Sequence, residues 1–315
     1  MKYVAPHFYK HFHCLAGQCL HTCCAEWEID IDEKTHALYQ SISGEFGTRL
    51  SDAIETNGDS VYFRLDVSER CPFLNRENLC DIILTLGEEA LCQICRDHPR
   101  FRNFFSDRTE IGLGLCCESA GKLLLGTTEK IRFVTLTHES DTVEINPDKE
   151  ESYFFECRQK IFVFLQDRTQ RIESRLKAVL SFCDTTLPQN TPAQWAEIFL
   201  QLERLDDVWT QNLQELQIAP KDVFQISLPQ ETDIFFEQLA VYFIYRHLAG
   251  ALTDGLFSAR AALSVLSVQI ISYFCKLYFW HHNILPLATV TEFARLYSSE
   301  IEYSSKNTDT LLSIL

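Results

Sequence analysis

Apolar residues recur at helical spacing through almost the whole C-terminal half of the chain. Asn146 and Pro147 form a helix start, with Asn as the cap and Pro at the first helical position, and the pattern predicts one long helix over residues 147–182. Another helix is predicted from Thr191, because Gln194 stands at the capping-box position. Further helices are predicted near residues 229–251, 256–281 and 286–313. We therefore expect this half to be all helical.

The first 140 residues mix two periodicities. Apolar residues four positions apart predict a helix over residues 32–55, whereas alternation over residues 60–67 predicts a strand. Residues 89–101 predict a helix that ends before Pro99. Beyond it the pattern predicts an extended segment, a helix and a strand at residues 109–116, 117–125 and 130–138.

A polar stretch over residues 138–152 separates the two patterns, and 315 residues are enough for two domains. We place the domains at residues 1–140 and 141–315. Ten of the 13 cysteines precede residue 120. The predicted fold class is mainly α, with an N-terminal cysteine-rich metal or iron-sulfur cluster domain that has a few short strands, followed by an all-helical domain.

The formal net charge of -16 disfavours a nucleic-acid partner, since phosphate binding depends on Lys and Arg. It suits docking onto a lysine-bearing protein surface better. The N-terminus has no apolar segment of the secretory kind, so we expect a cytoplasmic protein. The most apolar stretch, residues 261–275, is shorter than the roughly 20 residues that cross a bilayer, so we expect a buried helix and no membrane span.

The early cysteines fall into four short blocks, and thiolates gathered from several segments suit zinc or an iron-sulfur cluster. A redox dithiol at Cys92 and Cys95 and a set of simple core thiols are the alternatives. Neighbours in an extended segment point to opposite sides, so Cys23 and Cys24 are expected to do different jobs. The remaining thiols lie in helical, apolar patterns and are interpreted as inert core residues: Cys157, Cys183 and Cys275.

Other chemistry is weakly indicated. The chain has no GxGxxG after a strand, no P-loop and no HExxH. Tyr245, Arg246 and His247 are interpreted as the polar edge of a buried helix rather than as catalytic groups. His281 and His282 follow an aromatic run at a helix end, where exposure or capping is the expected role.

Three segments carry a family resemblance: CLAGQCLHTCCAEWEIDID, CPFLNRENLCDIILTLGEEALCQICRDHPRF and LCCESAGKLLL. Together they resemble the flagellin lysine-N-methylase family (FliB-like), within a wider YkgJ-like cysteine-cluster superfamily. Residues 242–267 are similar to that family's helical region. The resemblance implies transfer of methyl groups from S-adenosylmethionine to lysines of flagellin by a cytoplasmic protein with a 4Fe-4S cluster. It implies a ligand pool without Cys92 and Cys117, made of Cys14, Cys19, Cys23, Cys24, Cys71, Cys80, Cys95 and Cys116.

The implied reaction does not itself require the cluster. A lysine amine attacks a sulfonium methyl directly, which calls for a positioned donor, apolar surroundings and a proton acceptor, but no radical. The CxxxCxxC triplet of radical enzymes is absent, because Cys19 and Cys23 fit its first gap but Glu26 stands at the third position. The alternative is a zinc-stabilised module that docks a protein partner without catalysis. The sequence leaves the catalytic residues, the S-adenosylmethionine site and the oligomeric state open.

Overall fold

The chain divides into two compact units, and each is described by itself. A computed structural model describes residues 2–25, 28–58, 60–138 and 147–315. Residues 13–100 form one unit, the thiol unit, and residues 1–12 together with 101–315 form the other, the helical unit. The predicted domain boundary at residue 140 lies among residues 139–146, outside the described residues, and the contacts divide the chain at other places.

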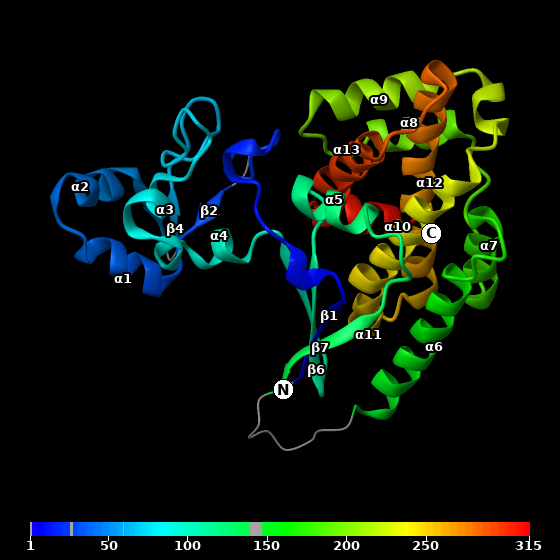
Figure 1. The fold of residues 1–315 in the computed structure, drawn as a ribbon, viewed down its shortest axis with the longest axis horizontal. Helices are drawn as coiled ribbons and strands as arrows, with labels where there is room; N and C mark the ends of the chain where they lie inside the picture. Colours follow the sequence, from blue (N-terminus) through cyan, green and yellow to red (C-terminus); the bar gives the residue numbers. More distant parts are fainter. Residues whose placement is uncertain (1, 26–27, 59, 139–146) are drawn as a thin grey trace. The chain divides into compact units, whose positions relative to one another are not determined.

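The helical unit contains a four-stranded sheet in the order β5-β6-β1-β7, of which Figure 1 labels β6, β1 and β7. β1 pairs parallel with β6 and antiparallel with β7, so the first strand of the chain joins strands that follow residue 100. The predicted extended segment at 109–116 and the strand at 130–138 are confirmed as β6 and β7. The strands are β1 (Lys2–Pro6), β5 (Arg100–Phe104), β6 (Arg108–Leu113) and β7 (Phe133–His138).

Helices make up most of this unit, as predicted. α10 and α12 are buried along most of their length, so they form the centre of its apolar core. The helices are α5 (Glu118–Leu125), α6 (Lys149–Leu165), α7 (Ile172–Phe182), α8 (Pro192–Leu200), α9 (Asp207–Ile218), α10 (Asp233–His247), α11 (Ala251–Asp254), α12 (Phe257–His282), α13 (Leu287–Tyr297) and α14 (Ser305–Leu312), with a π-helical turn at Ser298–Glu302.

The prediction of one helix over residues 147–182 is wrong, because α6 and α7 are separate and pack against each other. Between them the Asp167 carboxylate accepts hydrogen bonds from the Thr169 backbone N–H at 3.2 Å and from its hydroxyl at 2.6 Å. A short acidic side chain that binds nearby backbone competes with the helical hydrogen bonds and favours a turn. The capping box of Thr191 and Gln194 is confirmed, with both of its hydrogen bonds formed.

α12 is long and apolar enough to cross a membrane by length and composition alone. However, 67% of its most apolar window is buried inside the fold. The predicted buried helix is therefore confirmed, and it extends beyond residues 261–275 at both ends.

The described residues of the thiol unit form a three-stranded sheet in the order β2-β4-β3 and four short α-helices. The predicted helix over residues 32–55 is interrupted at Ile42 and Ser43, where Gly44 takes a φ of +82° that favours glycine. The elements are β2 (Ile29–Asp30), α1 (Glu33–Ser41), α2 (Gly44–Ala53), β3 (Ile54–Asn57), β4 (Ser60–Phe63), α3 (Asp81–Leu86) and α4 (Gln93–Asp97).

Candidate functional site

Five thiols of the thiol unit meet in one small core. Cys71 and Cys92 are buried in it, and Cys24, Cys80 and Cys95 pack against it. The Cys71 backbone N–H donates to the Cys24 carbonyl at 2.8 Å, which joins the first and second cysteine blocks. The chain then turns back at an isolated bridge between residues 74 and 80. Three of the four sequence blocks therefore contribute to one cluster.

The other predicted ligands of this unit lie nearer the surface. Cys14 and Cys23 are exposed, and the half-buried Cys19 thiol donates to the His21 carbonyl at 2.8 Å. Cys23 keeps a side-chain hydrogen bond with Cys24, so the vicinal pair places one thiol on the surface and one against the core.

The clustered thiols differ in acidity. The hydrogen bond from Cys23 lowers the pKa of Cys24 to about 7, with Arg70 acting in the same direction. The hydrogen bond from Cys95 lowers the pKa of Cys92, whereas burial raises the pKa of Cys71 to about 12. Metal ligation and nucleophilic attack both need the thiolate, so Cys24 and Cys92 are the members most ready to provide one.

The donor set fits a thiophilic metal in its chemistry, because soft thiolates select zinc and iron-sulfur clusters. The side chains are not arranged as a formed site: among the described residues, no three or more His, Cys, Asp and Glu groups could together hold a metal ion. Cys92, which the resemblance left out of the ligand pool, lies inside this cluster with its sulfur 3.5 Å from the Tyr39 hydroxyl. Its CxxC spacing with Cys95 was the sequence signal for it.

Cys116 belongs to the helical unit. Its thiol shares a hydrogen bond with Tyr303, and burial raises its pKa to about 12. In this setting it is a protonated thiol beside an aromatic hydroxyl.

A second group of polar side chains lies in the helical unit, at the C-terminal end of α10. The Tyr242 hydroxyl donates to Glu302 at 2.9 Å and accepts from Arg246 Nη1 at 2.7 Å. Arg246 Nε lies 3.3 Å from the Glu302 carboxylate, and His247 Nε2 contacts the same carboxylate. We call these four residues the Glu302 network.

The Glu302 network gives the contacts of Arg246 and His247 at the polar end of the buried helix α10, whereas Tyr245 lies in the core. Tyr245 is buried and donates to the Val4 carbonyl at 3.0 Å, which joins α10 to β1. The side chains of Arg246 and His247 are only 10% and 17% exposed. All three therefore face the interior, where an unpaired polar group would be costly.

The Glu302 carboxyl group and the His247 imidazole both have a lowered pKa. Burial raises the pKa of Glu302, but Arg246 and the hydrogen bond from His247 outweigh it and lower the pKa to about 2. Burial lowers the pKa of His247, with Arg246 and Arg260 acting in the same direction against Glu302. The carboxylate is therefore ionised and the imidazole neutral near pH 7.

Two glycines allow the close approaches around this network. A Cβ at Gly112 would lie 2.1 Å from the Phe101 ring, and that ring stacks 5.0 Å from the Arg246 guanidinium. A Cβ at Gly250 would lie 2.3 Å from the Arg260 guanidinium, which donates to the backbone carbonyl of residue 247 at 3.1 Å.

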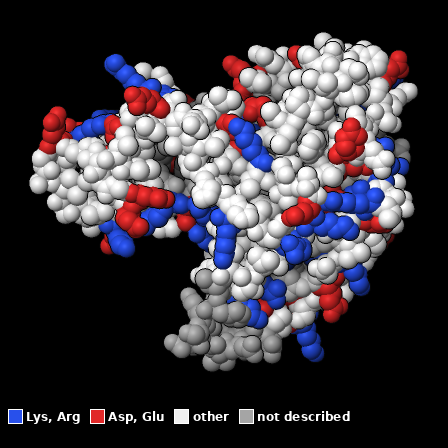
Figure 2. Space-filling model, in the orientation of Figure 1, with Lys and Arg blue, Asp and Glu red and all other residues white. Residues whose placement is uncertain are grey.

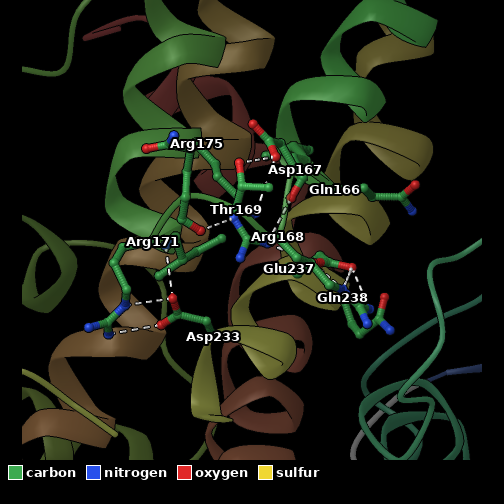
Figure 3. Close-up of polar contacts among 12 residues, drawn as sticks. Gln166, Asp167, Arg168, Thr169, Arg171, Arg175, Asp233, Glu237 and Gln238 are labelled. Atoms are coloured by element: carbon green, nitrogen blue, oxygen red, sulfur yellow. Dashed lines mark hydrogen bonds and ion pairs between the residues drawn. The ribbon is translucent and has the colours of Figure 1, made fainter. Parts of the chain in front are cut away.

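The other end of α10 is fixed by ion pairs to two buried carboxylates, Asp233 and Glu237 (Figure 3). Glu237, which has no exposed surface, accepts from Arg168 at 2.8 Å and from Arg175 at 2.6 Å. Arg171 binds Asp233 at 2.7 Å and so ties the start of α7 to the start of α10. These ion pairs fix the position of the helix that carries the Glu302 network.

Comparison with known proteins finds one matching family model and several related proteins. Residues 190–315 match the model of a family described as the FliB lysine N-methylase C-terminal domain. The chain is 23% identical over 260 residues to proteins named Lysine-N-methylase from Salmonella choleraesuis (strain SC-B67) and Salmonella typhimurium (strain LT2), and each match covers 74% of this chain and 61% of the relative.

A third relative is the Flagellar biosynthetic protein FliU of Salmonella muenchen, 29% identical over 126 residues, which are 38% of this chain and 75% of that protein. The chain spans about three fifths of the length of the two lysine-N-methylases. No solved structure matches significantly.

Proposed function

Since the chain is a relative of the FliB-like lysine-N-methylases, we propose that it transfers methyl groups from S-adenosylmethionine to lysine side chains of flagellin in the cytoplasm. The family match over residues 190–315 carries this proposal. That region holds the Glu302 network. The name of the third relative adds a flagellar context.

The surface charge of the chain agrees with a basic protein segment as substrate. Lys and Arg side chains are interspersed with Asp and Glu on the face shown in Figure 2, and the net charge is -16. An acidic protein attracts a lysine-bearing partner and repels nucleic acid.

The thiol cluster is proposed to hold a 4Fe-4S cluster, with zinc as the alternative. Candidate ligands in the thiol unit are Cys24, Cys71, Cys80 and Cys95, and Cys92 lies among them. A bound cluster or zinc ion would stabilise a small unit whose core is otherwise modest, since metal-binding free energy becomes folding free energy. Methyl transfer from a sulfonium to an amine needs no step at the metal.

Mass spectrometry of flagellin incubated with the purified protein and S-adenosylmethionine tests the function. We expect lysines heavier by one or more methyl units, and no change when the donor is omitted. Flagellin that stays unmodified under anaerobic conditions, with protein replete in iron and sulfide, would overturn the proposal.

A docking module without catalysis is the second candidate, and a groove of about 540 Å³ in the thiol unit favours it. Three carboxylates line this groove: Glu45, Asp52 and Asp66. Its two arginines are held by the groove's own backbone, because Arg49 donates to the Pro72 carbonyl and Arg64 to the Asp52 carbonyl. Flagellin that binds tightly without gaining methyl groups would support this reading over the enzyme.

A further inference from the structure

We propose that His247 accepts the proton from the substrate lysine and that Glu302 is the positioning residue that orients it. This inference rests on the proposed function and names the group that the methyl-transfer reaction needs. A protonated ε-ammonium has no lone pair, so an acceptor has to remove its proton before the nitrogen can attack.

The contact with Glu302 defines which ring nitrogen can act. His247 Nε2 contacts the ionised Glu302 carboxylate, so that nitrogen carries the hydrogen and donates it. The lone pair is then on Nδ1. Among the described residues no hydrogen bond to Nδ1 is found, and the side chain keeps 17% of its surface exposed. In this proposal the substrate amine approaches Nδ1 through that exposed part of the side chain.

The ring is also held in one orientation. The Phe243 ring stacks on the His247 imidazole, with centroids 6.3 Å apart and an angle of 21° between the planes. A base that is oriented on one side by a carboxylate and is open on the other is the arrangement used for general-base catalysis.

Charged groups from three elements face the imidazole. Glu302 of the π-helical turn favours its cation, while Arg246 of α10 and Arg260 of α12 oppose it. Arg260 is itself paired with Asp254 at 2.8 Å. Tyr242 and Arg246 keep the Glu302 carboxylate ionised, so it orients the ring without taking the proton.

The proposed step balances as follows. Nδ1 of His247 takes one proton from the ε-ammonium, which leaves a neutral amine. The amine lone pair forms the new N–C bond to the methyl group of the sulfonium donor while the S–C bond breaks, and the electron pair stays on sulfur as a neutral thioether. The imidazolium returns its proton to water.

The test compares four forms of the full chain: wild type, His247→Ala, Glu302→Gln and His281→Ala. His281 is an exposed histidine at the end of α12 and is the matched control. We expect His247→Ala to lower kcat by roughly 100-fold to 10,000-fold with little change in KM. Imidazole in solution should restore part of that activity, and His281→Ala should behave like the wild type. Glu302→Gln should move the acidic limb of the pH–rate profile.

Activity of His247→Ala within about twofold of wild type would overturn the inference, as would a loss that imidazole leaves unchanged in a protein that melts at the wild-type temperature. A wild type that transfers no methyl would instead overturn the proposed function. The protonation state and tautomer of His247 can still be measured directly in that case. Nitrogen NMR of His247 should find a neutral ring with hydrogen on Nε2 at pH 7, and an imidazolium or the other tautomer would contradict it.

Discussion

Two buried carboxylates of the helical unit each contact two basic side chains. Glu237 has no exposed surface and lies between Arg168 and Arg175, and Glu302 is shared by Arg246 and His247. Removing such a carboxylate leaves buried cations unpaired, which costs more than the ion pair itself contributes. These positions are therefore sensitive in a way that surface ion pairs are not.

Glu237→Ala is expected to lower the free energy of unfolding by about 3 to 5 kcal/mol, because Arg175 would remain buried without its partner. Urea unfolding measures this change. The control is Glu203→Ala, which breaks the exposed pair with Lys306 and should cost less than about 1 kcal/mol. Similar losses in both variants would contradict the argument.

Stability should fall as pH drops through the range in which Glu302 titrates. Its pKa is lowered from 4.5 to about 2 in the folded state, so its stabilisation is present above pH 4.5 and is lost as pH falls toward 2. The full effect is about 3 kcal/mol by linkage. Urea unfolding of wild type and Glu302→Gln between pH 2 and 6 measures it, and the variant should lose less stability over that range. Parallel curves would speak against this prediction.

At the scale of elements, the sequence predicts what depends on local chemistry. The capping box at Thr191 and the buried character of α12 follow from residue types at fixed spacing, and both are confirmed. The break after α6 was missed, because apolar spacing continues across it while the Asp167 turn redirects the chain. The pairing of β1 could not be predicted from local sequence either, since its partner strands come from residues after 100.

The same contrast between local sequence and tertiary contacts applies to the two candidate sites. The cysteine blocks are visible as a pattern, and most of them do meet in one core. The Glu302 network was missed as a unit because Tyr242 and Glu302 are 60 residues apart and only the fold brings them together. Nothing in the local sequence around residue 302 indicates a buried carboxylate.

Gly112 of β6 leaves room for the Phe101 ring of β5. Gly112→Ala should lower the free energy of unfolding by about 1 to 3 kcal/mol, because the new methyl group overlaps the Phe101 ring. Thermal and urea unfolding measure the loss. Phe101→Leu in the same chain should recover part of it, and a double variant that is less stable than the sum of the two changes would refute the proposed clash.

At the scale of the whole molecule, the thiol unit is an insertion between β1 and β5 of the helical unit. The unit has a separate core, to which five of its cysteines contribute, with its own sheet and helices. A metal bound there would add to the stability of residues 13–100 without entering the core of the helical unit.

Cys71→Ser combined with Cys80→Ser should abolish binding of iron or zinc, because both thiols belong to the proposed cluster site. Metal and sulfide content and the visible absorption spectrum of anaerobically prepared protein measure this. Cys275→Ala is the control, since that thiol is buried in α12 of the helical unit. Full metal content in the double variant would remove these residues from the ligand set.

The position of the insertion also orders events during synthesis. The ribosome completes residues 13–100 before it makes β6 and β7, the partners of β1. Domains generally fold as units while the chain emerges. The nascent thiol unit can thus fold first. β1 stays unpaired until more than a hundred further residues have been translated and its sheet can form.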